Sequence, residues 1–202
     1  MKINFENKLA VPILTYVLLI LIILLTKNFL SYNYIISLTA TFMLLVPIIL
    51  NEDENLFKID YYWFKKSVIW TVAIIGIYLV AAYFILSFFG KNLSFSKIGI
   101  SLVFVHLFLV AIPEEVFFRG YLQRKFGNTY LSIAIVSILF ALAHFITICV
   151  FGNHSLYSCS QSILTFFPSL LMGYLYFKTG TIWSSVFFHF IANLAHISMV
   201  IN

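Results

Sequence analysis

The chain has 202 residues, of which 62% are hydrophobic, 19% are aromatic and only 9% are charged, and its mean hydropathy is +1.04. These values exclude an ordinary soluble globular protein and indicate an integral membrane protein. The formal net charge of +5 is interpreted as a topology signal, and it gives no support for binding to nucleic acid.

Seven apolar runs predict seven transmembrane helices, since about 20 apolar residues cross a bilayer core of about 30 Å. The predicted fold class is therefore all-α, a polytopic membrane helix bundle. In chain order the expected spans are residues 9 to 25, 29 to 50, 67 to 89, a run that begins near residue 98, then 129 to 150, 163 to 177 and 181 to 201. No small-residue cleavage site follows the first run, so we expect that helix to be retained.

The chain is predicted to divide at about residue 97. Residues 1–97 form accessory transmembrane helices, joined by the polar segment 51–66, whose acids, bases and aromatics suit the membrane interface. Residues 98–202 carry almost all of the polar side chains that lie within apolar runs. The catalytic core is therefore expected in the last four helices.

Basic residues predict the orientation. With a cytoplasmic amino terminus, nine of the twelve Lys and Arg residues fall on the inner side, and only Lys27, Lys91 and Lys97 fall outside. Because inner loops carry the excess of positive charge, we expect the amino terminus inside and the carboxyl terminus outside.

The two cysteines, Cys149 and Cys159, are expected near the outer face, at the end of the fifth helix and in the loop that follows. They have no metal-ligand spacing. A disulfide is the alternative, but we expect two unpaired thiols.

Two adjacent glutamates, Glu114 and Glu115, lie inside the fourth apolar run, in the string Pro-Glu-Glu-Val-Phe-Phe-Arg that ends at Arg119. A carboxylate at membrane depth costs roughly 2.5 to 3.5 kcal/mol, so two side by side indicate chemistry rather than packing. Pro113 lacks a backbone donor and crowds the preceding turn, which predicts a kink or a helix restart directly before them.

The two glutamates are expected to have different roles. Glu115 and Arg119 are four residues apart, share a helix face and are predicted to form an ion pair that supports the fold. Glu114 points about 100° away from that face and has no cationic neighbour within a turn of helix. We therefore predict that Glu114 is the working carboxylate.

Three further polar residues lie in the later helices. His144 ends the string Phe-Ala-Leu-Ala-His in the fifth, and the seventh contains His189-Phe-Ile-Ala-Asn193. The four-residue spacing puts His189 and Asn193 on one face, where the amide can orient the imidazole or bind an oxyanion. The competing interpretation is a packing histidine at position 144 and interhelical hydrogen bonding at positions 189 and 193.

The order Glu-Glu-x-x-x-Arg, Phe-x-x-x-His and His-x-x-x-Asn, over residues 113 to 193, resembles the signature of the CPBP family. That family groups CAAX-type prenyl endopeptidases with bacterial relatives, including Abi-like proteins of bacteriocin processing and self-immunity. The compact chain and its content of Phe, Ile, Asn and Lys look like a bacterial member, which implies a location in a bacterial cell membrane.

The resemblance implies a metal-independent, glutamate-dependent intramembrane endopeptidase with no cofactor, which acts on a membrane-associated peptide or protein. Glu114 would be the base that activates a water, and His144 would help to hold that water. His189 and Asn193 would bind the oxyanion. Glu115 and Arg119 would support the site.

Three alternatives use the same residues. Glu114, His144 and His189 offer the two histidines and one carboxylate of a catalytic zinc site. The cluster could also be structural in a non-catalytic immunity or partner-binding protein. A transporter could use it as a proton relay, although no inverted repeat supports that function.

Overall fold

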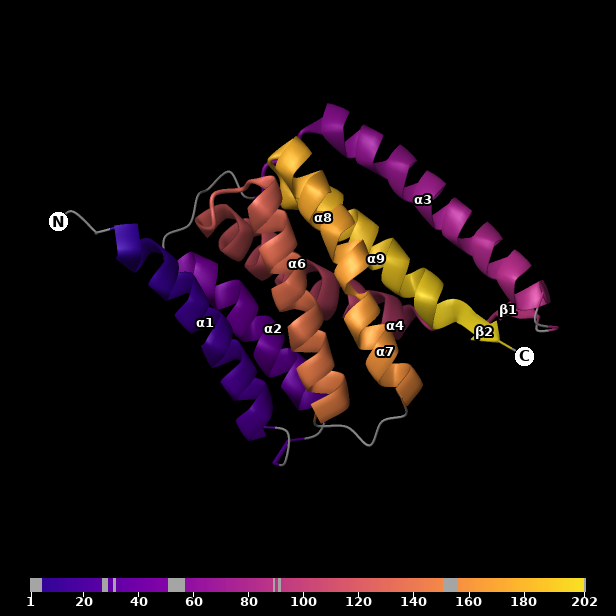
Figure 1. The fold of residues 1–202 in the computed structure, drawn as a ribbon, viewed down its shortest axis with the longest axis horizontal. Helices are drawn as coiled ribbons and strands as arrows, with labels where there is room; N and C mark the ends of the chain where they lie inside the picture. Colours follow the sequence, from indigo (N-terminus) through magenta and orange to yellow (C-terminus); the bar gives the residue numbers. More distant parts are fainter. Residues whose placement is uncertain are drawn as a thin grey trace.

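Long helices packed side by side make up most of the computed structural model, which describes residues 5–26, 29–30, 32–50, 57–88, 90, 92–150 and 156–201 (Figure 1). The α-helices are α1 (Phe5–Thr26), α2 (Tyr32–Ile49), α3 (Tyr61–Phe88), α4 (Ile100–Val105), α5 (Ile112–Glu115), α6 (Tyr130–Phe145), α7 (Leu156–Leu164), α8 (Phe166–Thr179) and α9 (Ile182–Ser198). Three π-helical stretches, η2 (His106–Ala111), η3 (Val116–Gln123) and η4 (Ile146–Val150), continue neighbouring α-helices. Two short strands, β1 (Leu93–Phe95) and β2 (Met199–Ile201), complete the described chain.

The predicted all-α membrane bundle is confirmed. Among the described residues, four helical stretches are long and apolar enough to cross a membrane: Leu9–Thr26, Tyr61–Phe88, Ile100–Gln123 and Tyr130–Cys149. A shorter apolar stretch, Tyr34–Ile49, corresponds to the second expected span. Helices α8 and α9, at 14 and 17 residues, lie where the sixth and seventh spans were expected.

Three boundaries differ from the predicted ones. Residues 51–56 of the expected interfacial segment lie outside the described residues, and its end, from Tyr61, already belongs to α3. The sixth span is broken between α7 and α8, because the ring of Pro168 crowds the carbonyl of Leu164, where α7 ends. The seventh helix stops at Ser198, and β2 pairs antiparallel with β1.

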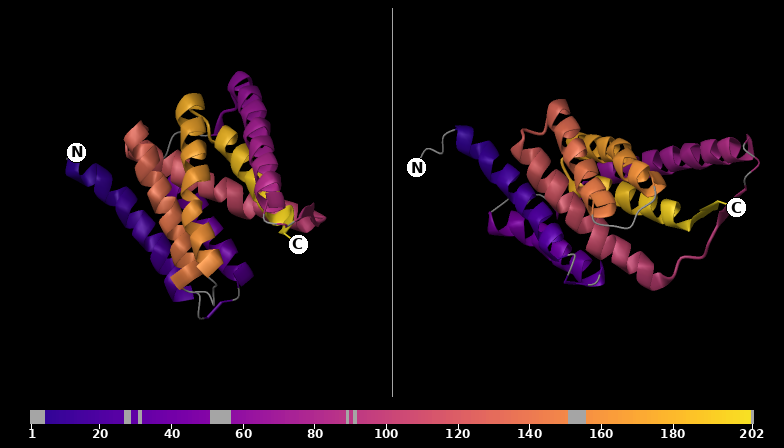
Figure 2. Two further views of the ribbon diagram at one scale, coloured as in Figure 1. Left: turned by 45° about the vertical axis from the view of Figure 1, so that its right-hand side comes forward. Right: turned by 60° about the horizontal axis from the view of Figure 1, so that its bottom comes forward.

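The helices form a slab with α1 and α2 along one side and α3 along the other (Figure 1). Helix α3 packs on α9, α9 on α8, and α8 on α6. The continuous helix from α4 to η3 crosses the slab and contacts α2, α6 and α9, as the right-hand view of Figure 2 shows. This crossing helix carries both glutamates into the centre of the bundle.

The apolar core surrounds η3. Phe117, Phe118, Tyr121 and Leu122 are at most 1% exposed and pack with Leu19 of α1 and with residues of α2, α6, α8 and α9. Phe118 lies edge-on to Phe140 of α6, with their ring centroids 5.0 Å apart. The helix that carries the glutamates is therefore packed against α1, α2, α6, α8 and α9.

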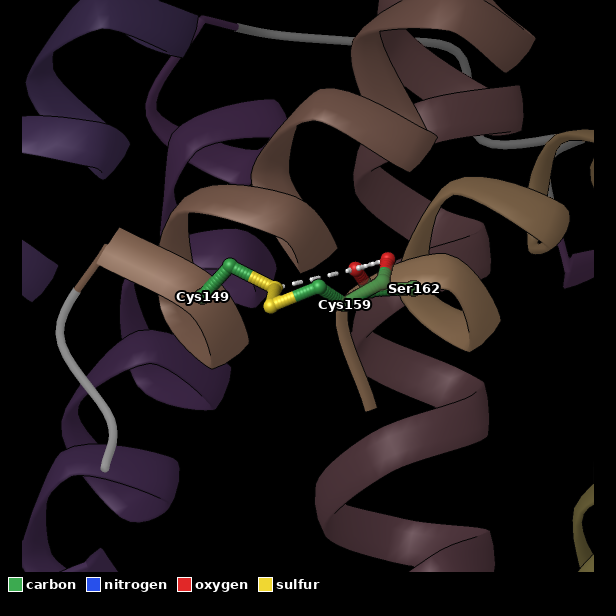
Figure 3. Close-up of a disulfide and its surroundings, with 3 residues drawn as sticks. All are labelled: Cys149, Cys159 and Ser162. Carbon is green, nitrogen blue, oxygen red and sulfur yellow. Dashed lines mark hydrogen bonds between the residues drawn. A yellow bond between two sulfur atoms is a disulfide. The ribbon is translucent and has the colours of Figure 1, made fainter. Parts of the chain in front are cut away.

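The two cysteines are joined by a disulfide, so the expectation of unpaired thiols is wrong (Figure 3). Cys149 lies in η4 and Cys159 in α7, and their Cα atoms are 5.3 Å apart, a separation typical of disulfides. The chain reverses between these two elements and brings together residues that are ten positions apart. Spacing alone does not reveal such a reversal.

Candidate active site

The helix that carries the glutamates changes its turn width twice. It is π-helical over His106–Ala111, α-helical over Ile112–Glu115 and π-helical again over Val116–Gln123. The predicted helix restart at Pro113 is not found, since Ala111 and Val116 keep helical backbone angles and the helix runs on without a free end. The wider turns accommodate the proline, and such π segments are frequent at functional sites.

Glu115 and Arg119 form the predicted ion pair. The Arg119 Nε lies 3.2 Å from Glu115 Oε2, and both side chains are fully buried. The Arg119 Nη2 donates to the hydroxyl of Ser169 at 2.9 Å and to its carbonyl at 3.2 Å, and the guanidinium lies 5.1 Å from the ring centre of Phe140. Two neighbouring helices therefore help to hold this pair in place.

His189 connects the two glutamates. Thr181 caps the start of α9 by accepting a hydrogen bond from the backbone of Trp183, and His189 lies two turns further along, 4% exposed. Its Nδ1 lies 3.0 Å from Glu115 Oε1, while its Nε2 lies 3.8 Å from Glu114 Oε2. The ionised Glu115 can only accept, so Nδ1 is the donor and the orientation of the imidazole is defined.

Glu114 is more accessible than Glu115. Its side chain is 17% exposed, whereas that of Glu115 is fully buried. The Oε2 atom of Glu114 is buried and has no hydrogen-bond partner among the described residues. The expected difference between the two carboxylates is thus present in their surroundings.

His144 contacts Phe140, whose ring also contacts His189. The Phe140 ring centre lies 4.3 Å from that of His144 and 5.8 Å from that of His189. The His144 Nδ1 donates to the backbone carbonyl of Phe140 at 3.0 Å, which leaves Nε2 as the ring nitrogen available to other groups. Helix α6 thus places Phe140 in contact with the rings of both His144 and His189.

Asn193 lies one turn after His189 on α9 and is partly exposed. Its amide makes no side-chain hydrogen bond within the part of the chain that the structure describes. For the zinc alternative, the described residues contain no group of three or more His, Cys, Asp or Glu side chains placed to hold a metal ion. Glu114, His144 and His189 therefore lack the arrangement that this alternative requires.

Several supporting residues were not predicted. Ser169 of α8 binds Arg119, and Ser185, which is fully buried one turn before His189 on α9, donates to the Ile182 carbonyl. Gln123 donates to the Gly173 carbonyl at 3.0 Å, which ties η3 to α8. The spacings Ser169 to Gly173 and Ser185 to His189 were visible signals, since small or polar residues four apart share a helix face.

A family model supports the resemblance seen in the motifs. The model of the type II CAAX prenyl endopeptidase Rce1-like family matches residues 95–195, half of the chain. The chain belongs to the Rce1-like family. It is therefore a membrane protease of the CAAX type, and the matched Rce1-like segment contains all six candidate site residues. No similar chain is found among curated proteins or among solved structures.

Proposed function

We propose that this protein is a glutamate-dependent endopeptidase that hydrolyses a peptide bond of a membrane-associated substrate close to the cytoplasmic face of a bacterial cell membrane. Residues 98–202 form the catalytic unit, and residues 1–97 are accessory. The observation that carries the proposal is the pair of adjacent carboxylates: Glu115 is held by Arg119 and His189, whereas Glu114 Oε2 makes no hydrogen bond within the described residues and its side chain is partly accessible.

Glu114 acts as the general base. It takes a proton from a water molecule, whose oxygen bonds to the scissile carbonyl carbon while the carbonyl oxygen becomes an oxyanion. The bond from carbon to nitrogen then breaks, and the leaving amine receives the proton from Glu114, which regenerates the carboxylate. His189 Nε2, 3.8 Å from Glu114 Oε2, is close enough to the path of that proton to help hold it.

His189 and Asn193 stabilise the oxyanion, and His144 joins Glu114 in holding the water. Preorganised donors are effective because they need no rearrangement as charge develops. Glu115 fixes His189 through Nδ1, and Arg119 fixes Glu115, so the ion pair acts by positioning. The contacts support this division, since Glu115 and Arg119 are bonded to each other and to neighbouring helices, whereas Glu114 Oε2 makes no hydrogen bond within the described residues and Asn193 is partly exposed.

An apolar groove along α6 suits an apolar substrate segment. It lies between α6 and the α7 to α8 region and is lined by Ile138, Ala141, Leu142, Phe145, Ile163 and Phe166. Apolar lining with few polar groups favours a lipid-modified or hydrophobic peptide over a soluble, charged one.

The test compares Glu114→Gln with the unmodified protein. Purified full-length chain in liposomes is incubated with a farnesylated CAAX peptide and with apolar membrane-anchored peptides identified by trapping on Glu114→Ala in native membranes. We expect Glu114→Gln to abolish cleavage and keep its melting temperature, because the amide keeps the shape but cannot accept the proton. Asp60→Asn, which removes an exposed carboxylate, is the matched control. Near-normal cleavage by Glu114→Gln would exclude the proposed base.

The orientation is tested separately by cysteine labelling in a background in which Cys149 and Cys159 are replaced by Ser. Lys125→Cys should react in intact cells only with a membrane-permeant reagent, because η3 leads to the inner face. Asn92→Cys should react with an impermeant reagent. The reverse pattern would move the proposed site to the outer half of the membrane.

A further inference from the structure

A further histidine lies on the helix that carries Glu114, and none of the three sequence motifs contains it. His106 is the first residue of η2, eight positions before Glu114 on the same continuous helix. Its imidazole interacts electrostatically with both Glu114 and His189. Helix α9, which carries His189, packs directly against η2.

Regular α-helical spacing does not predict that His106 and Glu114 share a helix face, but the π-helical turn between them changes this relation. In a regular α-helix each residue advances by about 100°, so two residues eight positions apart point about 80° away from each other. A π-helix bonds each residue to the fifth along the chain and advances less per residue. The stretch His106–Ala111 therefore turns His106 toward the face that carries Glu114.

The polar atoms of this group lack partners of their own. His106 Nδ1 and Glu114 Oε2 are both buried, and neither has a hydrogen-bond partner among the described residues. The separation of Glu114 Oε2 from His189 Nε2, 3.8 Å, is too long for a direct hydrogen bond, so this oxygen remains available to a water. A water needs two to four polar partners, and Glu114 Oε2 and His106 Nδ1 supply two of them.

The position of His106 along its helix places it within the membrane. His106 lies in a stretch, Ile100–Gln123, that is long and apolar enough to span the bilayer. A polar side chain there faces the bundle interior or a water-filled cavity, because lipid cannot satisfy it. With no protein partner for Nδ1 in the described chain, the group that satisfies it is water or substrate.

We infer that His106 is a further catalytic residue, which holds the attacking water together with Glu114, beside the oxyanion donor His189. This inference rests on the proposed function and deepens it. The water gives one hydrogen bond to Glu114 Oε2 and the other to His106 Nδ1, and this directs a lone pair of the oxygen at the scissile carbon. Glu114 takes the transferred proton. The second hydrogen stays covalently bonded to the oxygen and keeps its hydrogen bond to His106 Nδ1.

The first experiment measures kcat and KM for His106→Ala, His106→Asn and His106→Gln on the peptide that the unmodified protein cleaves. We expect His106→Ala to lower kcat by about 10²-fold, the scale of a misplaced reactant, with KM changed less than about twofold. The Asn amide reaches the position of Nδ1 whereas the Gln amide reaches that of Nε2, so Asn should restore most of the loss and Gln little. His196→Ala, an exposed histidine on α9, is the control.

The second experiment needs no substrate. Histidine labelled with ¹³C at Cε1 is incorporated into the full chain in lipid nanodiscs, and signals are assigned with single His variants. We expect Glu114→Gln to shift the signals of His106 and His189 and to leave that of His196 in place. An unmoved His106 signal would show that the two groups do not share a water, and it would overturn the inference.

The two failures can be distinguished. If the unmodified protein cleaves its peptide and His106→Ala keeps the kcat, the inference is wrong and the proposed function stands. An equal loss in the Ala, Asn and Gln variants, accompanied by a lower melting temperature, would show a structural role and also overturn it. If the unmodified protein cleaves none of the trapped or farnesylated peptides, the proposed function fails, and the catalytic role of His106 fails with it.

Discussion

Helix α3 and the stretch η3 are both apolar, yet they bury very different shares of their surface. Only 6% of the span in α3 is buried, and side chains such as Trp70 and Ile77 are more than 60% exposed. All eight residues of η3 are buried, including Arg119 and Gln123. In a membrane an apolar side chain gains little by leaving lipid, whereas a polar one must find partners. In this protein the most deeply buried helix segment is therefore the one that carries polar side chains in need of partners.

The largest effect should come from breaking the buried ion pair in η3. Glu115→Ala or Arg119→Ala leaves an unpaired buried charge, which costs on the order of 3 to 5 kcal/mol of unfolding free energy. The measurement is folded yield and chemical unfolding in detergent. Lys65→Ala, at an exposed position of α3, should change neither.

A paired substitution sharpens this result. Glu115→Gln combined with Arg119→Met removes both charges and should recover much of the folded yield, because no charge is left uncompensated. Activity should stay low, since His189 loses the carboxylate that orients it. An Arg119→Ala protein that is fully stable yet inactive would show that the division of roles between the two glutamates is wrong.

Asn193 provides the next contrast, because its amide has no hydrogen bond within the described part of the bundle. Asn193→Ala should leave stability near that of the unmodified protein and lower turnover by about 10² to 10³, the effect of losing one oxyanion donor. Asn193→Asp keeps the size but loses the amide donor, so it should be as slow. Full turnover by Asn193→Asp would remove this residue from the oxyanion site.

The smallest expected effect is a difference in stability between alanine substitutions at two glycines, Gly173 and Gly76. A Cβ added at Gly173 of α8 would lie 2.8 Å from Ile133 Cγ2 and 3.0 Å from Gln123 Oε1, whereas one at Gly76 of α3 meets nothing within 4 Å. Gly173→Ala should therefore destabilise the protein by about 1 to 3 kcal/mol. Gly76→Ala should be neutral or stabilise it by up to about 1 kcal/mol. Equal unfolding curves for the two variants would contradict the difference in packing.

The four longest spans were predictable because each is a long apolar run, and the bilayer imposes a fixed length on such runs. The pair Glu115 and Arg119 was predictable for a local reason as well, since residues four apart meet on any helix. Predictions failed where the outcome depended on neighbours. A kink or a helix restart was expected at Pro113, and no restart is found because the helix continues with wider turns. The disulfide depends on a chain reversal after η4.

The sequence by itself determined the class of the protein, its helical spans and the three polar motifs, because hydropathy and spacing are local properties. Only the tertiary structure decided which motif residues meet. It bonded His189 to Glu115, put the Phe140 ring in contact with both His144 and His189, and brought His106 within electrostatic range of Glu114. These contacts depend on how α6 and α9 cross the central helix, and crossing angles come from side-chain packing between helices far apart in the chain.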